Sequence, residues 1–178
     1  MKIVLILIVT IVTIYSCVNK KTVATKETIQ SSIDSVEKVL YATAATAPIN
    51  KTAGEIAVKT YANYVMKFPL DEKSPGYLFK AGEVASAIKM NKEAIEYFEL
   101  FVKNYPKNKK AASALFLQAF ICENDLQELG RANQIYIQVI EQYPGTNFAR
   151  DAAASINNLG KSPEDLIKEF EAKNKVNQ

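Results

Sequence analysis

Residues 94–106 read Ala-Ile-Glu-Tyr-Phe-Glu-Leu-Phe-Val-Lys-Asn-Tyr-Pro, an apolar stripe at helical spacing that ends in an aromatic residue and a proline. The same ending occurs at Phe68-Pro69 and at Tyr143-Pro144, so the three prolines are spaced by 37 and 38 residues. Five positions of the stripe match in all three copies: Ala57, Tyr61, Tyr64, Val65 and Phe68; Ala94, Phe98, Phe101, Val102 and Tyr105; Ala132, Tyr136, Val139, Ile140 and Tyr143. A period of this length predicts a stack of repeated helical units.

Each unit is predicted to be a pair of helices. In the second copy, helices are expected over 77–90 and 91–104, and Asn91 is expected to be the N-cap of the latter. The third copy is expected to place helices over 111–123 and onward to residue 142. A pair has one apolar face that it cannot bury alone, so neighbouring pairs must bury it. The fold class is therefore all-α.

The C-terminal part reads as a truncated fourth unit. A helix is expected over 148–159, followed by a last helix that begins at Ser162. Lys and Glu lie opposite the apolar stripe of this last helix, so it is expected to cap the stack; the stripe consists of Leu166, Ile167 and Phe170. The repeat domain is assigned to residues 51–173, and residues 174–178 are expected to be a frayed tail.

The N-terminus reads as a secretory signal. Met1-Lys2 precedes an uninterrupted run of 13 apolar or weakly polar residues over 3–15, and a small residue, Ser16, follows. A helix of that run would span roughly 20 Å, short of the ~30 Å hydrocarbon core of a bilayer. A permanent transmembrane helix is thus the weaker interpretation.

The stretch Ile14-Tyr15-Ser16-Cys17 resembles the bacterial lipobox. In lipoproteins the thiol of this Cys receives a diacylglycerol, the peptide is cut before the Cys, and the new amino terminus is acylated, for example with palmitate. The resemblance implies that residues 1–16 are a lipoprotein signal peptide and that Cys17 carries the lipid. The alternative is a Cys that merely lies beside an ordinary cleavage site.

Residues 17–50 are expected to hold the lipidated Cys, a polar tether and one helix. The helix is predicted within 29–45, before Pro48, because four apolar residues share one helical face: Ile29, Ile33, Val36 and Leu40. Some exported lipoproteins of the Bacteroidota carry an acidic run after the lipidated Cys. The present tether lacks such a run, which favours an orientation toward the periplasm over exposure on the cell surface.

Composition excludes several classes of function. The 178 residues contain no His, which removes His-based nucleophiles, zinc sites and proton switches. A net charge of +3 with only two Arg argues against nucleic-acid binding. Cys122 is interpreted as a small buried hydrophobe, and the acids near 123–128 as a solvated turn rather than a metal site. No catalytic residue, metal site or cofactor is therefore predicted, and the protein is not expected to be an enzyme.

The spacing of Gly82, Ala94, Phe98 and Pro106 resembles the tetratricopeptide repeat (TPR). After one inserted residue the third unit fits the same pattern with Ala119, Ala132, Tyr136 and Pro144. The resemblance covers about residues 51–160 and implies a short right-handed α-solenoid of TPR-like helix pairs that binds other proteins.

The chain with its lipobox is also similar to small TPR lipoproteins of the Bacteroidota, through Tyr77–Glu83, Leu115–Phe120 and Asn158–Lys168. It is similar in turn to the TPR domain of the Tol–Pal system periplasmic protein and, more distantly, to the outer-membrane assembly lipoprotein BamD. These resemblances imply an outer-membrane protein that faces the periplasm and binds envelope proteins or peptides.

The register of the TPR family places seven residues on the concave, groove-lining face: Phe79, Glu83, Ser86, Phe116, Phe120, Glu123 and Asn124. An apolar groove with an acidic edge suits an amphipathic or extended peptide. The alternative is that these Phe side chains pack in cis against the N-terminal helix at 29–45. The leading hypothesis is thus a membrane-anchored interaction scaffold in cell-envelope assembly or maintenance. The alternatives are a structural subunit of an outer-membrane assembly complex and, more remotely, an enzyme.

Overall fold

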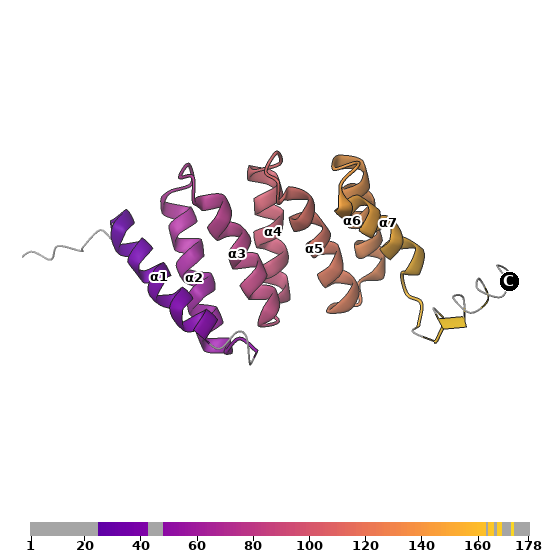
Figure 1. Cartoon of the computed structure of the whole chain (residues 1–178), viewed down its shortest axis with the longest axis horizontal. Coiled ribbons are helices and arrows are strands. Elements are labelled where there is room, and N and C mark those ends of the chain that lie inside the picture. The colour runs from indigo at the N-terminus through magenta and orange to yellow at the C-terminus, as the bar shows by residue number, and fades with distance from the viewer. Residues whose placement is uncertain (1–24, 43–47, 163, 166, 169–171, 173–178) are drawn as a thin grey trace, which may run out of the picture.

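The computed structural model describes residues 25–42, 48–162, 164–165, 167–168 and 172. These residues form seven helices, which follow one another in a single row (Figure 1). The helices are α1 (Lys26–Ala42), α2 (Lys51–Lys67), α3 (Ser74–Ala87), α4 (Asn91–Asn104), α5 (Ala111–Asn124), α6 (Leu129–Gln142) and α7 (Asn147–Asn158). No strand occurs in the described ranges, and each helix packs against the next one, which confirms the predicted all-α, TPR-like stack.

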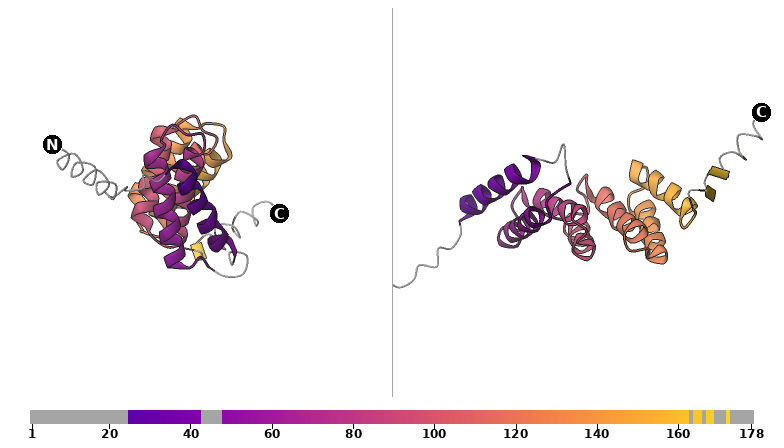
Figure 2. Two further views of the ribbon diagram at one scale, coloured as in Figure 1. Left: turned by 90° about the vertical axis from the view of Figure 1, so that its left-hand side faces the viewer. Right: turned by 90° about the horizontal axis from the view of Figure 1, so that it is seen from below.

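The helices form two layers. Contacts link α5 directly to α7, and side chains of α1 reach α3, as in the pair Glu37–Lys80. In the other layer Arg131 of α6 pairs with Glu99 of α4 at 3.4 Å. We call the exposed surface of α1, α3, α5 and α7 the odd face, and that of α2, α4 and α6 the even face. The end-on view in Figure 2 places the helices behind one another, so the stack extends in one direction.

The aromatic–proline steps end three helices in the same way. Phe68, Tyr105 and Tyr143 have φ of −131°, −132° and −128° and ψ of 57°, 51° and 52°. Each donates its backbone N–H to the carbonyl four residues earlier and then leaves the helix, because a following proline disfavours the α conformation. The shared geometry confirms the repeat that the proline spacing predicts.

The turn inside each pair also repeats. Lys89 after α3 has φ of 62°, and Gln127 after α5 has φ of 57°, so each turn contains one left-handed residue. The prediction of Asn91 as an N-cap is wrong: Met90 holds that position, and the buried Asn91 Oδ1 has no hydrogen-bond partner. Pro75 lies in the first turn of α3, where the missing N–H of a proline costs no helical hydrogen bond.

A glycine allows the helices of the second pair to approach closely. A Cβ atom built on Gly82 of α3 would lie 2.6 Å from the Phe98 ring of α4, well inside van der Waals contact. At the equivalent crossing in the next pair, Ala119 of α5 and Ala132 of α6 are fully buried. The core is therefore a continuous apolar seam between successive helices.

The N-terminal helix belongs to the packed stack. Ile29, Ile33 and Leu40 of α1 are buried in the common core, and α1 packs against α2. The helix predicted within 29–45 is confirmed, with bounds of Lys26 and Ala42. The packed region therefore begins at residue 26, ahead of the boundary expected at 51, and α1 is the first helix of the first pair.

Some predictions fall outside the described residues. They concern the signal at 1–16, Cys17, the tether up to residue 24, and the tail 174–178. Leu166 and Phe170 of the expected cap are also outside, while Ile167 is 58% exposed. Ser162 does accept the Asp165 N–H at 3.1 Å, as expected of an N-cap. None of the helices in the described ranges is long and apolar enough to cross a membrane.

Candidate protein-binding surface

The seven residues predicted to line a groove lie on two neighbouring helices of the odd layer. Phe79, Glu83 and Ser86 belong to α3, and the other four belong to α5. Their exposure differs strongly, so each is placed separately below.

Phe79 is a core residue and lines no groove. Its side chain is 3% exposed. Its ring meets those of Phe98 and Phe101 of α4 edge-on, at centroid distances of 5.5 and 5.4 Å. The ammonium of Lys110 lies 4.1 Å from the Phe79 centroid and covers the remaining side. The prediction for Phe79 is thus wrong, because the α4 aromatics enclose it.

Phe116 is half-buried in a second aromatic cluster. Its centroid lies 5.3 Å from that of Tyr136 on α6 and 5.7 Å from that of Phe148 on α7. Phe79 and Phe116 therefore do pack within the chain, as the alternative interpretation expected, but they do not pack against the helix at 29–45. Their ring contacts come from α4, α6 and α7, whereas α1 packs against α2.

Glu123 and Asn124 serve the fold locally. The Tyr136 hydroxyl donates to the Glu123 carboxylate at 2.7 Å. Burial, and then this hydrogen bond, raises the pKa of Tyr136. The Asn124 amide donates to the Phe120 carbonyl at 3.0 Å, within the last turn of α5.

Phe120 is the one residue of the predicted groove that stays exposed as a large apolar side chain. It is 47% exposed, and it lies opposite Leu115 and Gln118, which form the buried side of α5. Glu83 occupies the equivalent place on α3 and is exposed, whereas Ser86 is half-buried. Among the residues predicted to line the groove, the odd face therefore exposes Phe120, Glu83 and, in part, Phe116.

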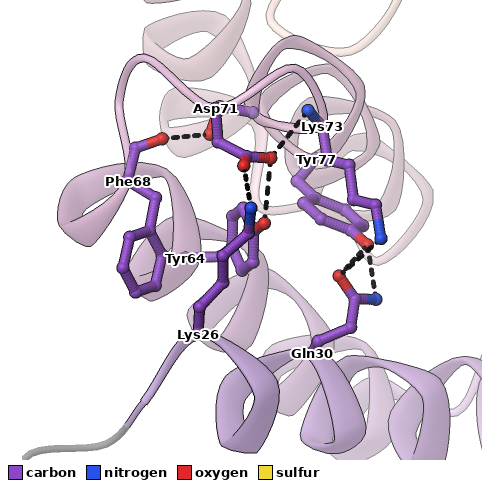
Figure 3. Close-up of polar contacts among 8 residues, drawn as sticks. Lys26, Gln30, Tyr64, Phe68, Asp71, Lys73 and Tyr77 are labelled. Atoms are coloured by element: carbon purple, nitrogen blue, oxygen red, sulfur yellow. Dashed lines mark hydrogen bonds and ion pairs between the residues drawn. The ribbon is translucent and has the colours of Figure 1, made fainter.

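A polar cluster that sequence reasoning missed joins α1 to the second pair. The Asp71 carboxylate pairs with Lys26 and accepts from the Tyr64 hydroxyl and the Lys73 N–H, both at 2.9 Å (Figure 3). The Lys26 hydrogen bond, the Lys73 N–H and the Tyr64 hydroxyl hold the pKa of Asp71 at about 2. Beside it, the Gln30 amide donates to the Tyr77 hydroxyl at 2.7 Å.

A second pair of contacts continues the junction between α1 and α3. Lys80 contacts Glu37 at 2.6 Å, and Glu37 also accepts the Tyr61 hydroxyl at 2.9 Å. The partners are far apart in the sequence, so no local pattern indicates either cluster. Together they make the first helix a bonded part of the stack.

The even face contains a crevice that was also missed. It lies between α4 and α6, has a volume of about 410 Å³, and has Leu115 and Gln118 of α5 among its lining residues. Gln118 is 3% exposed, and its Nε2 has no hydrogen-bond partner. One signal was present in the sequence: the repeat offset of 37 sets Gln118 against Ala81, an apolar position.

Comparison with known proteins bears on this arrangement. Residues 77–108, which cover most of α3, the turn after it, α4 and the start of the next turn, match the family model described as Tetratricopeptide repeat. The chain contains a tetratricopeptide repeat. No curated protein matches the sequence at a significant level. Within the matched TPR unit, the contact between Gly82 and Phe98 is the close helix crossing that the sequence pattern predicts.

TPR units are typically non-enzymatic scaffolds that mediate contacts between proteins. The match at 77–108 favours other proteins as partners of this chain.

Proposed function

We propose that the protein is a lipid-anchored periplasmic scaffold that binds envelope proteins or peptides across its odd face. The observation that carries the proposal is Phe120, a large aromatic side chain left 47% exposed in the middle of a TPR-like stack. Aromatic residues at the centre of an interface contribute a large share of binding energy. Cell-envelope assembly or maintenance is the proposed setting.

The anchor is supported by sequence alone. Ile14-Tyr15-Ser16-Cys17 has the residue types of a lipobox, and the apolar run before it has the length of a signal sequence. We place the lipid on Cys17 and the protein at the outer membrane, facing the periplasm. The segment from 18 to 25 then links the anchor to α1.

The anchor is tested by metabolic labelling with palmitate, beside a Cys17→Ala variant. Incorporation of label into the wild type and its loss in the variant are expected. Label in neither protein would contradict lipidation. Fractionation of the envelope then tests the membrane, and protease protection in intact cells tests the orientation.

The binding face is tested by crosslinking and purification of the full-length protein from solubilised envelopes. Phe120→Ser should abolish capture of a defined partner. Leu100→Ser is the matched control, because Leu100 is 40% exposed on α4 of the other layer. Equal capture by both variants would show that the partner binds elsewhere, as expected of a structural subunit joined through its ends.

A further inference from the structure

The crevice between α4 and α6 is lined by a buried side-chain amide whose donor has no acceptor within the described part of the fold. Gln118 is 3% exposed, and its Nε2 donates to nothing in the described chain. A buried donor without an acceptor is strongly unfavourable, so native structures rarely retain one. Gln118 is among the residues that line an open crevice of about 410 Å³, so a rotation of its terminal amide can turn the donor toward an acceptor there.

The preceding unit shows that the polar residue is unnecessary for stacking. Ala81 of α3 is the equivalent of Gln118 and is fully buried. Tyr97 of α4 stands at the equivalent of Ile135 and packs against the core. The third unit therefore has Ile135 where the second unit has the larger Tyr97, and it has the amide of Gln118 where the second unit has Ala81.

The walls of the crevice suit a peptide backbone. Gln134 and Gln138 of α6 both line it, and each has an exposed side chain with a donor and an acceptor. Residues four apart on a helix are separated by about 6 Å along its axis. Backbone groups on one side of an extended peptide repeat every two residues, or about 6.6 Å. The two glutamines therefore match the spacing of an extended strand.

The remaining lining sets the chemistry of the side chains. Val102, Leu115 and Ile135 provide apolar surface. Arg131 is already paired with Glu99 and Glu128, at 3.4 and 3.2 Å. Lys103 lines the same crevice and forms no ion pair within the described ranges.

We propose that this crevice binds an extended peptide segment of a partner protein, with a backbone carbonyl that accepts from Gln118 Nε2. Gln134 and Gln138 bond to the peptide backbone, and an acidic side chain of the peptide pairs with Lys103. The site rests on the proposed scaffold function but is separate from the odd face, since the crevice opens between α4 and α6 on the even face.

The probe is a phage-displayed library of random linear peptides, panned on the purified full-length protein. Enriched peptides are then synthesised, and their affinity is measured by calorimetry. Gln118→Ala should weaken binding roughly tenfold, the effect of one buried hydrogen bond. The double variant Gln134→Ala, Gln138→Ala alters only exposed side chains, so it tests the site even if Gln118→Ala folds poorly.

A change in the backbone of the peptide tests whether the site recognises the peptide backbone or only its side chains. Replacing single amides of the peptide by esters weakens the carbonyl acceptor, so one ester position should reproduce the loss seen with Gln118→Ala. On the Gln118→Ala protein the same ester should have no further effect. Phe120→Ser should leave the affinity unchanged.

Three results would overturn the inference. They are an unchanged affinity in Gln118→Ala and in the double variant, a dependence on Phe120 alone, or a library that yields no binder. In each case the proposed scaffold function is judged separately, by the capture of an envelope partner with Phe120→Ser and Leu100→Ser.

Discussion

The second unit (α3 and α4) and the third unit (α5 and α6) have one backbone plan and different interiors. In the second, Phe79 meets Phe98 and Phe101, and none of these three rings has a hydroxyl. In the third, Phe116 meets Tyr136, whose hydroxyl donates to Glu123. The residue equivalent to Glu123 in the second unit is Ser86, beside a Phe that needs no acceptor.

The first unit follows the third. Tyr61 stands where Phe98 and Tyr136 stand, and its hydroxyl donates to Glu37 of the preceding helix at 2.9 Å. A hydroxyl at this position is thus matched by a carboxylate one helix earlier. At each of these helix crossings, the aromatic residue and the residue that faces it on the preceding helix therefore have to match. The family pattern specifies that the position holds an aromatic ring, but it does not specify the acceptor for a tyrosine hydroxyl.

The tightest crossing provides the largest expected effect. Gly82→Val places carbon atoms where the Phe98 ring lies, and we expect a loss of about 3 kcal/mol of unfolding free energy in urea. Gly76→Ala on the same helix is the control, because nothing lies within 4 Å of its Cβ position, and it should not destabilise. A Gly82→Val protein as stable as the control would mean that the crossing can widen freely.

The second-largest effect is expected from exchanging the residues at the equivalent buried positions 81 and 118. Ala81→Gln adds volume and an amide to a filled position and should cost about 2 kcal/mol. Gln118→Ala removes an unpartnered donor and should change stability by no more than about 0.5 kcal/mol. Chemical unfolding of both variants checks this. A large loss in Gln118→Ala would assign the amide a structural role.

A smaller effect is expected where a hydroxyl is added. Phe98→Tyr should cost about 1.5 kcal/mol, because the repeat offset sets Ser86 where the third unit has the Glu123 carboxylate, so the new hydroxyl gains no carboxylate partner. Adding Ser86→Glu to that variant should recover part of the loss, as a double-mutant cycle in unfolding experiments would show. If the two substitutions are simply additive, the pairing rule drawn from Tyr61 and Tyr136 does not transfer to the second unit.

The cluster around Asp71, which joins α1 to the stack, should make the stability of the fold depend on pH in the acid range. Asp71 has a pKa of about 2 in the fold and about 4 in an unfolded chain. A lowered pKa stabilises the folded state above the unfolded value, and the contribution is lost as pH falls from about 4 to 2. The melting temperature of the wild type should therefore converge on that of Asp71→Asn over this range.

The partner variant sharpens this last test. Lys26→Ala removes the first contributor to the low pKa of Asp71, so it should narrow the difference between wild type and Asp71→Asn at neutral pH. A gap that stays constant from neutral pH to about 2 would contradict the assignment of this carboxylate.

Periodicity was sufficient for the existence of the helices, for the C-terminal ends of α2, α4 and α6, and for the crossing at Gly82. Each of these depends on residues close in sequence or on a regular offset, so Phe68, Tyr105 and Tyr143 end their helices as the pattern predicts. The place of α1 in the stack was missed because residues 17–50 were assigned outside the repeat domain, although the Ile29–Leu40 stripe was present in the sequence.

The exposure of individual side chains, on which the candidate site depends, could not be predicted from the sequence. Phe79 and Phe120 were assigned to one face by the same register, yet one is enclosed by α4 and the other is half in solvent. Whether a ring is covered is decided by the side chains of neighbouring helices, which no single stripe contains. For the same reason the bonds of Asp71 and the unpartnered Gln118 emerged only when helices distant in the sequence were packed together.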